Sequence, residues 1–130
     1  MRRNPIPAEV REFVSREIKS VFQLEVLLLL HRTQEHAWTV TEISQELAIK
    51  PEIVETDVLR LEKIGLIQMR LTTPISYIFD PGDPDDQVIV EKLAISYDKQ
   101  RVGIFSLILS EADSRIRRFA EAFRLIRGGD

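Results

Sequence analysis

Side chains that could support catalysis are few in this chain, and their spacing is unfavourable. The two histidines, His31 and His36, lack the i, i+4 spacing of a helical metal site, and the chain has no cysteine to complete one. The serines do not stand in the strand–turn–helix setting of a nucleophile. The five glycines are scattered or terminal, so no loop could cradle a phosphate. We therefore expect no catalytic residues, no metal and no cofactor, and we predict that the protein is not an enzyme.

Length and composition predict one compact domain. The chain has 130 residues, of which 44% are hydrophobic and 30% charged, and it has no room for two independent cores. Its longest apolar run, residues 26–30, is far shorter than the roughly 20 residues of a membrane span. The lack of cysteine fits a reducing compartment, and no apolar signal segment follows the first residues. We expect a cytoplasmic protein that does not enter a membrane.

Charge is distributed unevenly along the chain. The net charge is −3, but residues 33–100 carry 6 cations against 13 anions, whereas the two ends together carry 12 cations against 8 anions. The simplest interpretation is that the ends pack near the acidic middle of this chain or of a second copy. A nucleic-acid-binding domain more often carries a basic patch on its reading face.

The first part of the chain, residues 8–38, is expected to hold two helices. Val10, Phe13 and Val14 recur at helical spacing and give the first helix one apolar face. Ser20 and Gln23 form a capping box that opens a second helix, from about 21 to 32. That helix is apolar nearly all round, so it should form the centre of the core.

Residues 39–79 have the layout of a winged helix-turn-helix. Thr39 and Glu42 form a capping box for a short helix that ends near Ala48. Pro51 suits the first position of the next helix, and Gly65 suits its end. Residues 66–71 and 75–79 predict two strands joined by a turn, which would form the wing.

Residues 83–127 are expected to be helical. Asp83 caps a helix that runs at least to Gln100. Residues 102–109 fit either a strand or a helix, and we favour a helix that continues to about Leu109. A last helix should begin after a new cap at Ser110. Its apolar stripe includes three residues that we assign, with Val10, Phe13 and Val14, to a dimer interface: Ile116, Phe119 and Phe123.

Residues 39–48 and 53–67, which end in Leu-Glu-Lys-Ile-Gly-Leu-Ile, resemble the winged-helix core of MarR-type transcriptional regulators. The resemblance implies a mainly helical fold with a small β-wing, flanked by N-terminal and C-terminal helices. It also implies that the second helix of the motif reads the DNA major groove, that the wing touches the minor groove, and that terminal helices join two copies in a homodimer.

The resemblance places six residues at the DNA: Pro51, Glu52, Glu55, Thr56, Arg60 and Arg70. Two of them are glutamates, which oppose phosphate, although acidic residues near a helix N-terminus also stabilise the helix dipole. Two functions therefore follow from the sequence. The first is a small dimeric DNA-binding regulator, and the alternative is an interaction module that docks a partner protein through its acidic face without binding DNA.

Overall fold

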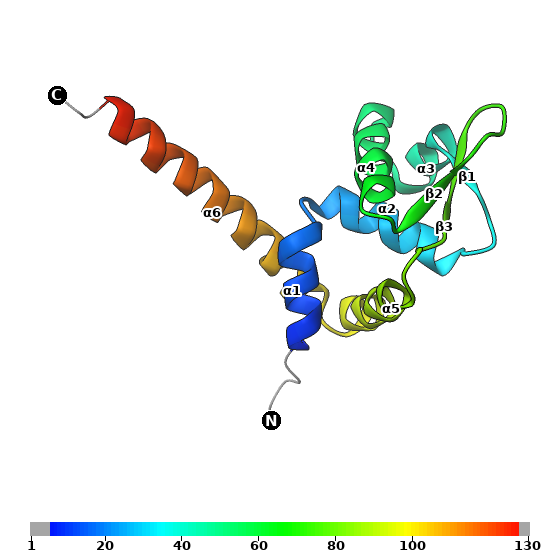
Figure 1. The fold of residues 1–130 in the computed structure, drawn as a ribbon, viewed down its shortest axis with the longest axis horizontal. Coiled ribbons are helices and arrows are strands. Elements are labelled where there is room, and N and C mark those ends of the chain that lie inside the picture. The colour runs from blue at the N-terminus through cyan, green and yellow to red at the C-terminus, as the bar shows by residue number, and fades with distance from the viewer. Residues whose placement is uncertain (1–5, 128–130) are drawn as a thin grey trace.

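The computed structural model describes residues 6–127, and the side chains of residues 6–122. Within that range, six helices and three short strands follow one another in the order α1 (Ala8–Glu17), α2 (Val21–Arg32), β1 (Trp38–Thr39), α3 (Val40–Leu47), α4 (Pro51–Lys63), β2 (Ile67–Arg70), β3 (Ser76–Phe79), α5 (Pro84–Lys99) and α6 (Arg101–Arg127). Figure 1 shows α2, α3, α4 and the sheet grouped together, with α1, α5 and α6 on the other side of α2. This architecture confirms the predicted fold class.

Helix α2 is the centre of the core. Leu24, Leu27 and Leu30 are fully buried, and the helix packs against α3, α4, α5 and β3. Burial on several sides explains why its sequence is apolar nearly all round.

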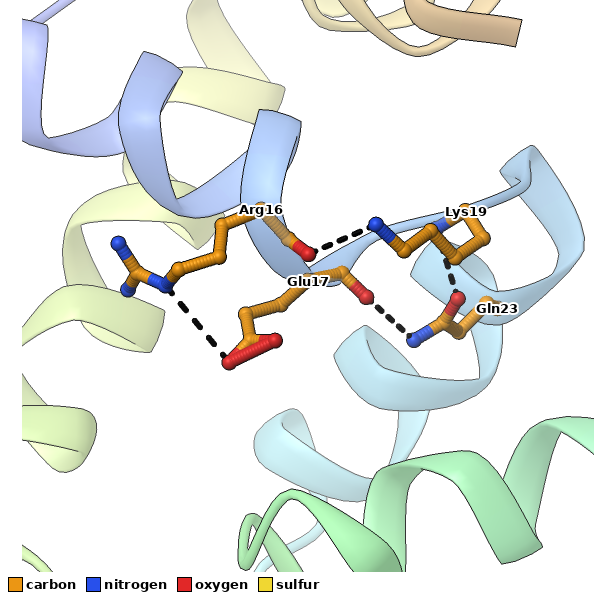
Figure 2. Close-up of polar contacts among 4 residues, drawn as sticks. All are labelled: Arg16, Glu17, Lys19 and Gln23. Atoms are coloured by element: carbon orange, nitrogen blue, oxygen red, sulfur yellow. Dashed lines mark hydrogen bonds and ion pairs between the residues drawn. The ribbon is translucent and has the colours of Figure 1, made fainter. Parts of the chain in front are cut away.

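The turn between α1 and α2 is held by the side chain of Gln23 (Figure 2). The backbone N–H of Gln23 donates to Ser20 Oγ at 3.0 Å, as the capping box predicts. However, Gln23 Oε1 accepts from the N–H of Lys19 rather than from that of Ser20, at 2.8 Å. Its Nε2 atom donates to the carbonyl of Glu17 at 3.0 Å. The expected reciprocal bond is therefore displaced by one residue, because Gln23 also satisfies the last turn of α1.

The helix-turn-helix boundaries follow the local chemistry of the sequence. Both hydrogen bonds of the Thr39–Glu42 capping box are present, and Pro51 is the first residue of α4. Gly65 adopts a φ of +84°, which favours glycine and ends the helix as predicted. On α4 the fully buried residues Val54, Val58 and Leu61 face the core.

The wing belongs to a three-stranded antiparallel sheet with the order β1-β3-β2. Ile67 pairs with Phe79 and Met69 with Tyr77 across the hairpin. Strand β1 is missing from the sequence prediction because two residues are too few to show an alternating pattern. Trp38 pairs with Tyr77 there.

The boundary between the last two helices differs from the prediction. Residues 102–109 are helical, but they belong to α6 and do not continue α5. Gln100 separates the two helices: its N–H closes α5 on the carbonyl of Ser96 at 2.7 Å, and its own carbonyl accepts from Ile104 at 3.0 Å. Helix α6 then runs through Ser110 without the expected break, because Ile104 and Ile108 are both buried on one continuous face.

The apolar stripe of α1 is covered within the chain. Val10, Phe13 and Val14 are buried where α1 packs against α5 and α6. These three side chains, which the sequence assigns to a dimer interface, are therefore buried in the core of a single chain and are not on its surface. Figure 1 shows α6 passing α1 and then extending away from the other elements.

Candidate nucleic-acid interface

The outer face of α4 is the candidate reading surface. The helix turns its buried residues toward α2 and α3, which leaves the opposite face open to solvent. All six residues assigned to DNA from the sequence are exposed, five of them on α4 and the sixth, Arg70, at the end of β2. Helix α4 packs against β2, so the candidate reading helix and the wing lie next to each other.

Two further residues belong to this face and were not assigned from the sequence. Leu59 and Lys63 are exposed and lie at helical spacing from Thr56, three and seven residues further along α4. Lys63 supplies a cation to the second half of α4. The periodicity that identified the buried residues of α4 would also have found both, since residues on the side of a helix opposite its buried stripe face outward.

The charges of the outer face nearly balance. Glu52 and Glu55 in the first half of α4 are followed by Arg60 and Lys63 in the second half. Within the wing, residues 67–79, Arg70 is the only charged residue. The surface therefore has an acidic start and a mildly basic end, and not the continuous basic field that attracts phosphate.

Tyr77 shows that two acidic residues lie where α4 meets the wing. The pKa of its phenol is raised, first by burial and then by the negative charges of Glu62 and Glu55. These carboxylates therefore lie close enough to Tyr77 on β3 to raise the pKa of its phenol. The negative charge of α4 extends from its start along the side that faces the wing.

Asp57 is a third acidic residue of α4, after Glu52 and Glu55, but its side chain does not face outward. Its side chain is 3% exposed, and its Oδ2 atom has no hydrogen-bond partner among the described residues. Burial raises its pKa from 3.8 to about 6, against the lowering effect of Arg60. The sequence gives no signal of this burial, because Asp57 occupies the edge of the apolar stripe. It takes no part in the candidate interface.

The described residues offer no rival site for a metal or a membrane. Among residues 6–127, no group of three or more histidine, cysteine, aspartate or glutamate side chains could hold a metal ion. No helix within the same range is long and apolar enough to cross a membrane.

The fold and the exposed second helix define a winged helix-turn-helix protein. Over 94% of its length the chain is similar to MepR, described as a transcription regulator of the Staphylococcus aureus multidrug efflux pump MepA, with a TM-score of 0.55 and 14% identity over 88% of that chain. The structure of S. aureus MepR bound to ethidium bromide aligns with a TM-score of 0.49 and 15% identity, over 94% of this chain and 89% of that one. Known protein families and curated proteins give no match. At this level of identity the likeness to MepR shows the winged-helix fold.

Proposed function

We propose that this protein is a small dimeric winged-helix regulator that binds DNA. The observation that carries the proposal is the open outer face of α4, with the wing beside it, in a fold shared with a transcription regulator. A helix presented in this way fits the major groove, which is wide enough to admit it. Because the chain has no cysteine, it suits the reducing cytoplasm, where we place its activity.

In this proposal the first turns of α4 read bases and its end contacts phosphate. N-terminal residues of a reading helix meet the base edges, which brings Pro51, Glu52, Glu55 and Thr56 to the groove. A glutamate can accept from the amino group of cytosine. Arg60, Lys63 and Arg70 would neutralise phosphates, so each copy offers few such contacts. We therefore expect modest affinity with a shallow dependence on salt.

The second copy would pack along α6. Apolar residues on this helix recur at alternating intervals of three and four, the a and d positions of a coiled coil. Within the described side chains these positions are Val102, Phe105, Leu109, Ala112, Ile116 and Phe119. In the sequence the spacing continues at Phe123 and Ile126, whose side chains lie outside the described residues. Ile104 and Ile108 are buried in the core, and Phe105, at the start of the stripe, also packs against the core and meets Tyr97 of α5 edge to face.

Exposure of this stripe argues for a partner helix. Leu109 and Ile116 are 60% and 67% exposed. On the same helix, Arg115 donates to the carbonyl of Lys19 in the turn between α1 and α2. Beyond this contact α6 extends away from α1 (Figure 1). An unsupported helix of this kind is marginal in water, so apolar residues at heptad spacing favour a second α6 as its support.

DNA titration tests the proposal and separates it from the alternative. We expect the full chain to bind mixed-sequence duplex DNA at about 50 mM salt, where phosphate contacts are strongest, and to have a light-scattering mass near twice the 15.0 kDa of one chain. Undetectable DNA binding under these conditions would overturn the regulator and favour the protein-docking module. A mass near one chain at micromolar concentration would overturn the dimer.

A further inference from the structure

We propose that the side of α4 next to the wing, together with the wing itself, binds a basic amphipathic helix of a partner protein. This α4–wing face is defined by four exposed apolar residues, Leu59, Met69, Leu71 and Ile75, and three acidic ones, Glu52, Glu55 and Glu62. The inference goes beyond the proposed function, since it assigns a protein ligand to a surface that would also meet DNA.

The apolar residues of this face are unusually exposed for their size. Leu71 is 88% exposed and Leu59 is 51% exposed, and Met69 and Ile75 also stand on the surface. Single exposed apolar residues are normal, but several on neighbouring elements of one side of a protein mark an interaction surface. Leu71 and Ile75 flank the wing tip, and Thr72 fixes that tip by a hydrogen bond of 2.8 Å to the carbonyl of Pro74.

The acidic residues border the apolar ones. Met69 pairs with Tyr77 across the hairpin, so the two side chains share one face of the sheet. The phenol of Tyr77 feels the charges of Glu62 and Glu55 on α4. Helix α4 also packs directly against β2, the strand that carries Met69, so the acidic side of α4 and the apolar wing form one mixed surface.

This combination does not suit phosphate and does suit a basic amphipathic helix. Carboxylates repel phosphate, and leucine or methionine side chains form no favourable electrostatic contact with it. A helix with apolar residues at i, i+3 or i+4 and i+7 could cover Leu59, Met69 and Leu71. Lysine and arginine on its flanks would then meet Glu52, Glu55 and Glu62, which would speed association and fix orientation. Occupation of this face would cover the reading surface of α4 and exclude DNA.

Fluorescence anisotropy on the full chain, without DNA, tests the proposal. The probe is a labelled helical peptide of about 18 residues, five turns, made of leucine and lysine in an amphipathic pattern. One control peptide has the same composition with the leucines spread round the helix, and another has glutamate in place of lysine. We expect saturable binding of the first peptide, at least about tenfold tighter than that of either control. Equal binding of the two lysine peptides would overturn the proposal, since it would mean attraction by charge alone.

Variants locate the site. The double substitution Met69→Gln with Leu71→Asn should weaken peptide binding about tenfold, and Glu55→Gln with Glu62→Gln should weaken it by a similar factor. The matched control, Glu12→Gln with Glu35→Gln, removes the same charge from exposed positions on α1 and after α2, and should change binding less than about twofold. Peptide binding unchanged in both test variants, or weakened equally in the control, would overturn the assignment.

Two further measurements distinguish other occupants and the fate of the proposed function. If Met69→Gln with Leu71→Asn lowers the light-scattering mass, the face is covered by a second copy, and the partner proposal is wrong. If the protein binds DNA, the peptide should displace it, and simultaneous binding of both would contradict exclusion. If the protein binds the peptide but no DNA, the regulator proposal fails while this one stands.

Discussion

The Nε2 atom of His31 on α2 lies 2.9 Å from Oε2 of Glu91 on α5, 60 residues further along the chain. The imidazole is 8% exposed, and its ring meets Phe79 of β3 edge to face, with 5.1 Å between the ring centroids. One side chain therefore connects the core helix, the sheet and the first of the two C-terminal helices. Because α5 leads directly into α6, this contact helps to fix the direction in which α6 leaves the winged helix.

Replacing Glu91 tests this connection. Glu91→Ala removes the acceptor of the His31 hydrogen bond, and we expect the free energy of unfolding to fall by about 0.5–1 kcal/mol. The low end of that range is appropriate because the Glu91 side chain is 57% exposed. Urea denaturation measures the change. The same substitution in a His31→Leu background should have almost no further effect, and an equal loss in both backgrounds would contradict the contact.

Asp57 gives the stability of the protein a dependence on pH. Its folded-state pKa of about 6 exceeds the ordinary 3.8, because burial disfavours the charged carboxylate. Between these two values the folded state therefore binds more protons than the unfolded state. Stability should fall as pH rises from about 4 to 6 and become level above that range.

The variant Asp57→Asn removes this titration. We expect it to flatten the fall in stability between about pH 4 and 6, and to raise the free energy of unfolding at pH 7 by up to about 3 kcal/mol, the value of a two-unit shift. Urea denaturation at a series of pH values measures both effects. The control Glu52→Gln, at an exposed position on the same helix, should keep the wild-type slope. A slope unchanged in Asp57→Asn would mean that another group causes it.

Gly65 is required for its backbone conformation and not for space. Its φ is +84°, and a Cβ atom added there would meet nothing within 4 Å. Gly65→Ala should therefore cost about 1 kcal/mol of stability through backbone strain alone. Gly82→Ala is a matched control, since that site is equally open and has no positive φ of the left-handed range. Thermal unfolding should separate the two variants, and equal midpoints would show that the conformation of Gly65 carries no strain for alanine.

Local chemistry explains which parts of this fold the sequence predicts. The Thr39–Glu42 box, Pro51 and Gly65 act within a few residues of their own position, so their effects can be read without knowing the fold. The buried residues Val54 and Val58 follow from helical periodicity in the same way. These features are enough to predict the winged helix-turn-helix.

Features that depend on distant packing were not predicted. The break at Gln100 arises because α6 must turn Ile104 into the core, and residues 98–102 contain no helix-ending signal such as glycine or proline. The apolar face of α1 could have met a second copy, but α5 and α6 cover it. Asp57, on the buried side of α4, is a similar case. Its neighbours decide that it is buried, and an aspartate at that position would ordinarily be placed on the surface.

The stripe on α6 gives a direct test of the proposed dimer. Ile116→Glu with Phe119→Glu places two charges in the a and d positions, where burial against a partner would desolvate them. We expect the light-scattering mass to fall to that of one chain at micromolar concentration. Ser110→Glu adds a charge to an exposed position of the same helix outside the stripe, and should leave the mass unchanged. A dimer that survives the double substitution would place the interface elsewhere.

Charge reversal on α4 tests whether its outer face meets DNA. Glu52→Lys with Glu55→Lys replaces two carboxylates that repel phosphate with two ammonium groups that attract it. If α4 reads the groove, DNA should bind at least about tenfold more tightly at about 50 mM salt, and the slope of log affinity against log salt should steepen by about 0.9 for each new phosphate contact. Glu12→Lys with Glu35→Lys changes the net charge equally on other parts of the surface, so it controls for long-range attraction. A gain no larger than that of the control would mean that Glu52 and Glu55 do not face DNA, and that any DNA contact is made by a surface other than α4.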